Sequence, residues 1–178
     1  MAVLQMPPAS LRDTIAHVAS VLRSVPGVGN VHTYRRWTRD PAKYLALLKP
    51  AATDQLNAWW VTRRSTRRRR ENDGDRVVVV HEIRIEGILT LHDPPTLDAA
   101  AEDAASAPRF CSLVEAVCDK FEDQSVRANT MGGTVLTSDP VQVATEDERM
   151  FGDHLVHFAE LGITVKDARY VALTDRVL

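Results

Sequence analysis

Cysteine is scarce in this sequence, and its placement argues against a disulfide bond. The chain of 178 residues holds two cysteines, Cys111 and Cys118. Seven positions on a predicted helix separate their Cα atoms by ~10 Å, which is too far for a disulfide. Free thiols of this kind are typical of a reducing compartment. Because the predicted helix has an apolar stripe, we expect both cysteines to be buried and to act as small hydrophobic residues.

Long apolar runs are also absent. No segment approaches the ~20 apolar residues that a membrane helix needs. The first residues, MAVLQMPPAS, are too few for the apolar core of a signal peptide and lack its basic start. We therefore expect synthesis in the cytoplasm and no association with a membrane.

The common signatures of catalysis and of metal or cofactor binding are missing. The sequence contains no Gly-x-Ser-x-Gly segment and no Gly-x-x-x-x-Gly-Lys phosphate loop. His154 and His157 point to opposite faces of a predicted strand, and no third metal ligand has suitable spacing. His81 and His157 are instead expected in the core, each with a hydrogen-bond partner. The sequence therefore predicts no catalytic residue, no metal and no cofactor.

A large excess of one charge is missing too, although the basic residues are clustered. The formal net charge is −2, which does not favour nucleic acid as a general partner. Six arginines nevertheless gather just after Trp60, and acidic residues follow them at once. The cluster can contact phosphate, can form a solvated loop balanced by these acids, or can contact another subunit. Its members are Arg63, Arg64, Arg67, Arg68, Arg69 and Arg70.

One long stretch, Arg76 to Leu91, is the strongest structural signal that is present. Its odd positions are mostly apolar, which is typical of a β-strand with one buried face. A straight strand of this length spans roughly 50 Å, so it either bends, for example at Gly87, or projects from the domain body. A projecting strand can offer its edge to a partner. Its polar side, Glu82, Arg84 and Glu86, is therefore a candidate for partner contacts.

The other elements form a pattern of clustered strands, with helices that do not alternate with them one for one. This order predicts a single α+β domain over 1–178, with a mostly antiparallel sheet packed against an N-terminal helix and one central amphipathic helix. The predicted elements are a helix over 11–24, a strand over 31–35, a short helix from 41, a strand over 56–64, a protruding arginine-rich loop over 65–75, an alanine-rich helix over 97–105, an amphipathic helix with Phe110, Leu113, Val114, Val117 and Phe121 on one face, a flexible loop over about 123–139, a strand over 140–145, a polar turn over 146–153 and a long strand over 155–171.

Two adjacent tryptophans lie in the strand before the arginine cluster. Trp59 and Trp60 must point to opposite faces of that strand. One is expected in the core and the other exposed or covered by a partner. We take Trp60 as the candidate for partner contact.

The runs VPGVGNVHTYRRW, LNAWWVTRR, VVVVHEIRIEGILTL and DHLVHFAELGITVKD, with this element order, resemble tail terminator and tail-completion proteins of tailed phages and prophages, including the lambda-type terminator. The resemblance implies a non-catalytic structural protein of the virion, made in the host cytoplasm. Such proteins form a ring, usually a hexamer, which caps the tail tube, stops its polymerisation and joins it to head or neck proteins. The long strand and the arginine loop then become candidate contacts with other subunits or the tube.

Two other classes of protein stay open at this point. A nucleic-acid-binding module would use the cluster from Arg63 to Arg70, and its binding would weaken steeply with salt. A small enzyme would need a pocket that gathers polar groups from distant segments, and the sequence alone does not show one.

Overall fold

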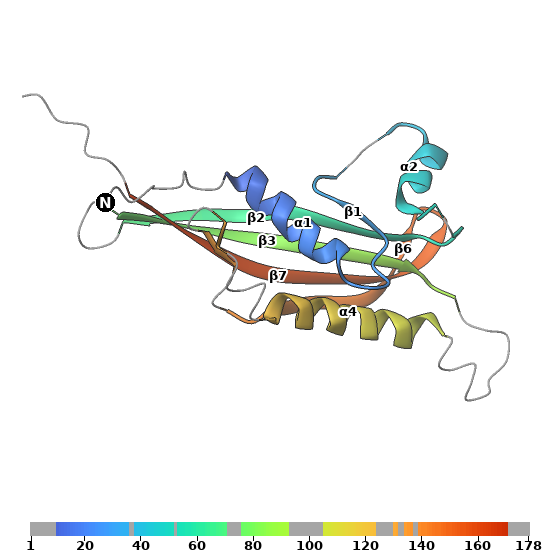
Figure 1. The fold of residues 1–178 in the computed structure, drawn as a ribbon. Coiled ribbons are helices and arrows are strands. Elements are labelled where there is room, and N and C mark those ends of the chain that lie inside the picture. The colour runs from blue at the N-terminus through green and yellow to red at the C-terminus, as the bar shows by residue number, and fades with distance from the viewer. Residues whose placement is uncertain are drawn as a thin grey trace, which may run out of the picture.

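A long, mostly antiparallel β-sheet runs through the molecule in this computed structural model (Figure 1). The structure describes residues 10–35, 38–51, 53–70, 76–92, 105–123, 130–131, 134–136 and 139–170. The predicted α+β class is confirmed, because three helices accompany the sheet in this part of the chain. The elements are α1 (Leu11–Arg23), β1 (Asn30–His32), α2 (Pro41–Leu48), β2 (Asn57–Arg70), β3 (Arg76–Thr90), α4 (Ser106–Glu122), β4 (Thr130–Met131), β5 (Thr134–Leu136), β6 (Gln142–Phe151) and β7 (His154–Tyr170).

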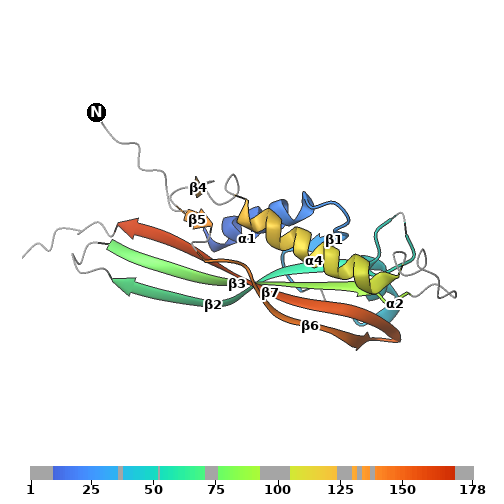
Figure 2. The same ribbon diagram turned by 90° about the horizontal axis from the view of Figure 1, so that it is seen from below.

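β3, the strand with the strongest sequence signal, lies in the middle of the sheet. The strand order is β1-β2-β3-β7-β5-β4, and β6 also pairs with β7. β3 pairs with β7 over its whole length and with β2 from Val77 to Leu89, antiparallel in both cases. The expectation that this strand offers its own edge is therefore wrong, because both of its edges are occupied. The expected projection is present, since β2, β3 and β7 extend together beyond the helices (Figure 2).

The main core lies between one face of the sheet and two helices. α1 begins with the expected capping box, in which Ser10 and Asp13 bond each other's backbone N–H groups. It buries Val18 and Leu22 against the sheet, and α4 buries all five residues of its predicted apolar stripe beside them. Both helix predictions are confirmed. We call this side of the sheet the helix face.

The opposite face of the sheet is covered at one end only. The predicted start of α2 is confirmed, because the Asp40 carboxylate accepts hydrogen bonds from two N–H groups of its first turn and Pro41 follows. α2 places Leu48 and neighbouring apolar residues over Trp60, Ile88 and Phe158. The prediction that one tryptophan is exposed is wrong, since Trp59 and Trp60 are 0% and 6% exposed. We call this side the open face.

Two segments that were predicted as loop or turn are strand. β2 continues through Arg70, so the charged loop predicted from Ser65 is wrong for its first half. A register shift after Arg63 lets the following arginines pair with the first residues of β3. β6 replaces the polar turn predicted over 146–153, and the true turn holds Gly152 at φ +60°.

Three predictions fall wholly or largely on residues that the structure does not describe. These are the tip of the arginine-rich hairpin at 71–75, the alanine-rich helix at 97–105 and the flexible loop at about 123–139. The described part of the last range includes β4 and β5, so the loop prediction is wrong at 130–131 and 134–136, where β5 pairs with the distant β7 and β4 pairs with β5.

Two buried histidines hold the packed elements together, as expected. His81 is 5% exposed, and its Nδ1 lies 3.0 Å from the Thr66 hydroxyl. His157 is 6% exposed, and its Nε2 lies 2.9 Å from the Ser106 hydroxyl. The Ser106 oxygen also accepts a 2.7 Å hydrogen bond from the His92 N–H, so it joins the segment after β3 to α4 and β7.

Replacing Ser106 with alanine is therefore expected to destabilise the protein by about 2 kcal/mol, because His157 and the His92 N–H lose their partner. Chemical denaturation measures the change. Ser112, which is exposed on the same helix, gives the control, since S112A should change stability by less than ~0.5 kcal/mol. Equal stability of the two variants would contradict this role for Ser106.

Candidate functional site

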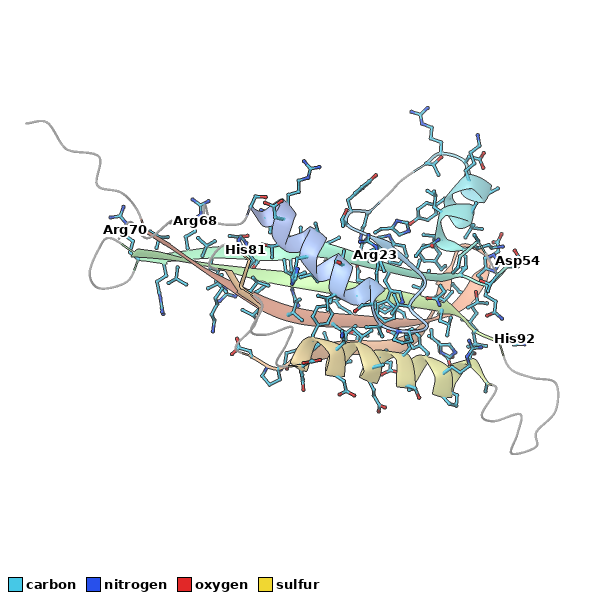
Figure 3. All side chains as sticks on the ribbon, in the orientation of Figure 1. Arg23, Asp54, Arg68, Arg70, His81 and His92 are labelled. Carbon is cyan, nitrogen blue, oxygen red and sulfur yellow. The ribbon has the colours of Figure 1, made fainter. Side chains whose placement is uncertain are left out.

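The outer border of β2 is open over most of its length. β1 pairs with β2 through Ala58, Trp59 and Trp60. Beyond these positions, no strand within the described residues pairs with this border. We call the stretch from Thr62 to Arg70 the basic edge, because it carries all six clustered arginines. Figure 3 shows Arg68 and Arg70 at the projecting end of the sheet, far from Asp54 and His92 at the other end.

The arginines of the basic edge divide between the two faces of the sheet. Arg68 is opposite Val79 in the ladder and lies on the helix face, together with Arg70. Arg67 and Arg69 lie on the open face. All of them are exposed. Both faces of this end of the sheet therefore carry positive charge.

Acidic residues on the open face neutralise part of this charge. Arg67 Nη2 lies 2.9 Å from a carboxylate oxygen of Glu82, and Arg64 and Arg84 each lie 3.8 Å from the Glu160 carboxylate. These exposed and half-exposed pairs contribute little to stability. Glu82 and Arg84 are half-buried, as expected for the polar side of β3.

Glu86 departs from that expectation, because it is buried. It is 6% exposed, and both of its carboxylate oxygens accept hydrogen bonds from Arg35, at 2.5 and 2.7 Å. This bond raises the pKa of the Arg35 guanidinium. Arg35 follows β1 and reaches across the sheet, a contact that alternation within β3 could not predict. Glu86 therefore has an internal partner, which weakens it as a candidate for contact with another chain.

A cavity of about 210 Å³ opens beside this ion pair. Its walls combine the Arg35–Glu86 pair with aromatic rings from α2, β2, β6 and β7. The guanidinium of Arg149 lies 3.7 Å from the centre of the Phe158 ring, and burial raises the pKa of Tyr44. The cavity can hold a small apolar or aromatic group. Its lining residues are Arg35, Tyr44, Trp60, Glu86, Ile88, Arg149, Met150, Phe151, Val156 and Phe158.

A second open border lies along β6, which we call the acidic edge (Gln142–Phe151). β6 pairs with β7 on one side, and no strand in the described part of the chain pairs with its other side. Almost every residue of β6 is exposed, including the apolar Val143 and Met150 at 48% and 66%. Three consecutive acids, Glu146 to Glu148, occupy its middle. The polar centre of β6 predicts a turn when the local sequence is considered alone, so the sequence does not indicate this surface.

The two cysteines are free thiols, as predicted, but their surroundings differ. Burial raises the pKa of Cys118 to about 11. Cys111 is exposed, which corrects the expectation that both cysteines are buried. Its thiol donates a hydrogen bond of 3.1 Å to the Glu146 carboxylate, and this bond raises its pKa.

Replacing Glu146 with glutamine is expected to speed alkylation of Cys111 severalfold near pH 8, because the thiolate loses a neighbouring negative charge. Mass spectrometry after timed iodoacetamide treatment measures both cysteines separately. Cys118 should stay slow in both proteins. Glu115, which affects Cys111 more weakly, provides E115Q as the control. An unchanged Cys111 rate in E146Q would contradict the contact.

Two further observations concern the same described ranges. No group of three or more His, Cys, Asp or Glu side chains there is arranged so that it could hold a metal ion. No helix there is long and apolar enough to cross a membrane.

Comparison with known proteins adds no assignment. No protein-family model matches the chain, and no curated protein sequence matches it. The geometry of the basic and acidic edges, together with the resemblance in element order, is therefore what supports a function for this chain.

Proposed function

We propose that this chain is a non-catalytic structural protein that assembles head to tail into a ring, and that it acts as a tail terminator of a tailed phage. The ring would cap the tail tube, stop its polymerisation and join it to head or neck proteins. Six subunits are the expected number, and the virion tail or neck is the expected location.

The observation that carries this proposal is the basic edge. From Thr62 to Arg70 the border of β2 presents backbone N–H and C=O groups that no described strand pairs. Such a border readily accepts another strand. A closed ring with heterologous contacts gives every subunit one neighbour on each side, so an open border of one subunit can be covered by the next.

Electron microscopy of the concentrated, negatively stained protein tests this proposal. Closed rings of one size, with six repeats around the circumference, are the expected result. Open filaments, amorphous aggregates or isolated subunits at high protein concentration would contradict a closed ring.

A second candidate is a nucleic-acid-binding module, and one observation favours it. Four arginines of the basic edge, Arg63 and Arg68 to Arg70, make no ion pair within the described residues. If this surface contacts six phosphates, the affinity should fall roughly a thousandfold between 50 and 200 mM salt. Fluorescence anisotropy with a labelled 20-base-pair DNA duplex distinguishes the two functions. The ring proposal expects no binding at physiological salt.

A further inference from the structure

Two of the open borders of the sheet, the basic edge and the acidic edge, carry opposite charge. The basic edge holds six arginines, and the acidic edge holds Glu146, Asp147 and Glu148 at its centre. We propose that the basic edge of one subunit pairs, as an antiparallel strand, with the acidic edge of the next copy of this chain. The proposal rests on the proposed ring and names the surfaces that close it.

The strand directions allow this pairing without turning a subunit over. β2 runs antiparallel to β3, β3 to β7, and β7 to β6. β2 and β6 therefore run in opposite directions within one subunit. A second copy rotated about the ring axis presents its β6 antiparallel to β2 of the first, so the contact is heterologous and continues around the ring.

The charges match on both faces of the continued sheet. Glu146 is opposite Ala159, which belongs to the core on the helix face. Glu148 lies on the same face, and Asp147 lies on the open face. The basic edge has Arg68 and Arg70 on the helix face and Arg67 and Arg69 on the open face. Glu146 and Glu148 would therefore meet positive charge on the helix face. On the open face Asp147 already pairs with Arg149 of its own strand at 2.7 Å, and Arg67 with Glu82, so Arg69 supplies the charge that is not paired there.

Charge also disfavours the alternative pairings of these borders. Two basic edges facing each other would bring arginines into direct opposition, and two acidic edges would do the same with carboxylates. Like charges opposite each other destabilise a strand pair. A charged border resists non-specific pairing, while a border of opposite charge overcomes that resistance. Pairing would also cover Val143 and Met150, which are exposed apolar residues on β6.

The two edges lie at different levels of the sheet (Figure 2). One level of the sheet connects the two edges. At this level Gln142 of β6 pairs with Gly162 of β7, Gly162 pairs with Arg84 of β3, and Arg84 pairs with Thr62 of β2. The acidic edge thus ends at the level where the basic edge begins. A neighbouring copy must be displaced along the strands by roughly 30 Å, the length of β6. A closed ring accommodates such a displacement if the strands tilt relative to the ring axis, as they do in β-barrels.

Charge reversal tests the proposed pairing. The first variant replaces Arg68, Arg69 and Arg70 with glutamate, and the second replaces Glu146, Asp147 and Glu148 with lysine. The third combines both sets and keeps the native net charge of −2. Light scattering at matched concentration is expected to show at least a tenfold loss of ring for the first two variants and recovery in the combined variant.

Control variants separate this contact from general effects of charge. One replaces Glu115, Asp119 and Glu122 with lysine, and the other replaces Arg12, Arg39 and Arg109 with glutamate. All six positions are exposed and lie outside both edges, so rings should persist. Circular dichroism confirms that each variant is folded.

The outcomes distinguish failure of the edge pairing from failure of the proposed function. A ring that survives either single-edge reversal, or a combined variant that stays dissociated, overturns the pairing and leaves the proposed function intact. A native protein that forms no ring at any concentration overturns both. DNA binding that is lost in the first variant, without any ring in the native protein, would assign the basic edge to nucleic acid instead.

Discussion

Replacing Gly87 with alanine is expected to destabilise the protein by about 3 kcal/mol, although the substitution adds a single methyl group. A Cβ at this position would lie 2.6 Å from two ring atoms of Trp59, far inside van der Waals contact. Trp59 is 0% exposed and its ring is stacked near Phe110 at 6.3 Å between centroids, so it has no room to move. Overpacking of a filled core typically costs about 1–3 kcal/mol or more.

Gly162 provides a matched control for this prediction. It lies in the neighbouring central strand β7, and a Cβ there would be 3.9 Å from the nearest atom, which is ordinary contact. G162A should therefore leave the stability unchanged or raise it slightly. In thermal denaturation, G87A is expected to lower Tm by roughly 6–12 °C. Equal Tm values for G87A and G162A would contradict the packing of Trp59 against β3.

Replacing Phe110 with alanine should have a similar or larger effect, about 4 kcal/mol. Phe110 is 1% exposed and lies between Trp59 and the imidazole of His157, 5.6 Å from the latter between centroids. Its loss would leave a cavity where α4 meets the sheet. Because Trp59 and Phe110 are in contact, the effects of F110A and G87A should not add in the double variant.

Urea denaturation measures this second effect, and the exposed neighbour Ser112 again supplies the control. S112A should differ from the native protein by less than ~0.5 kcal/mol. The variant F110L keeps most of the apolar volume and should recover more than half of the lost stability. A change below ~1 kcal/mol for F110A would show that α4 is not anchored in the core at this position.

The sequence predicts the core well, because each core element has a strong local pattern. The i, i+3, i+4 spacing from Phe110 to Phe121 and the alternation of β3 specify which side of each element is buried. The capping residues Ser10 and Asp40 also specify where two helices begin. Spacing, alternation and capping each involve residues that are close together in the sequence, so the sequence alone is enough to recognise them.

The candidate surfaces are harder to predict because they depend on pairing between distant segments. Arg67 to Arg70 lack the β-branched or aromatic side chains that favour strands, and they extend β2 opposite the valines at the start of β3. The acidic residues of β6 also belong to a strand because of a distant segment, since β7 supplies the hydrogen-bonding partners of their backbone. The Arg35–Glu86 contact joins residues 51 positions apart, and nothing in the local sequence of either residue indicates it.

The mass of the purified protein in solution tests the central proposal most directly. Light scattering over a range of protein and salt concentrations should show one species near six times the chain mass of 19.8 kDa. That species should dissociate more readily at high salt, because salt screens the attraction between the oppositely charged edges. A single species of 19.8 kDa at every concentration would contradict the ring.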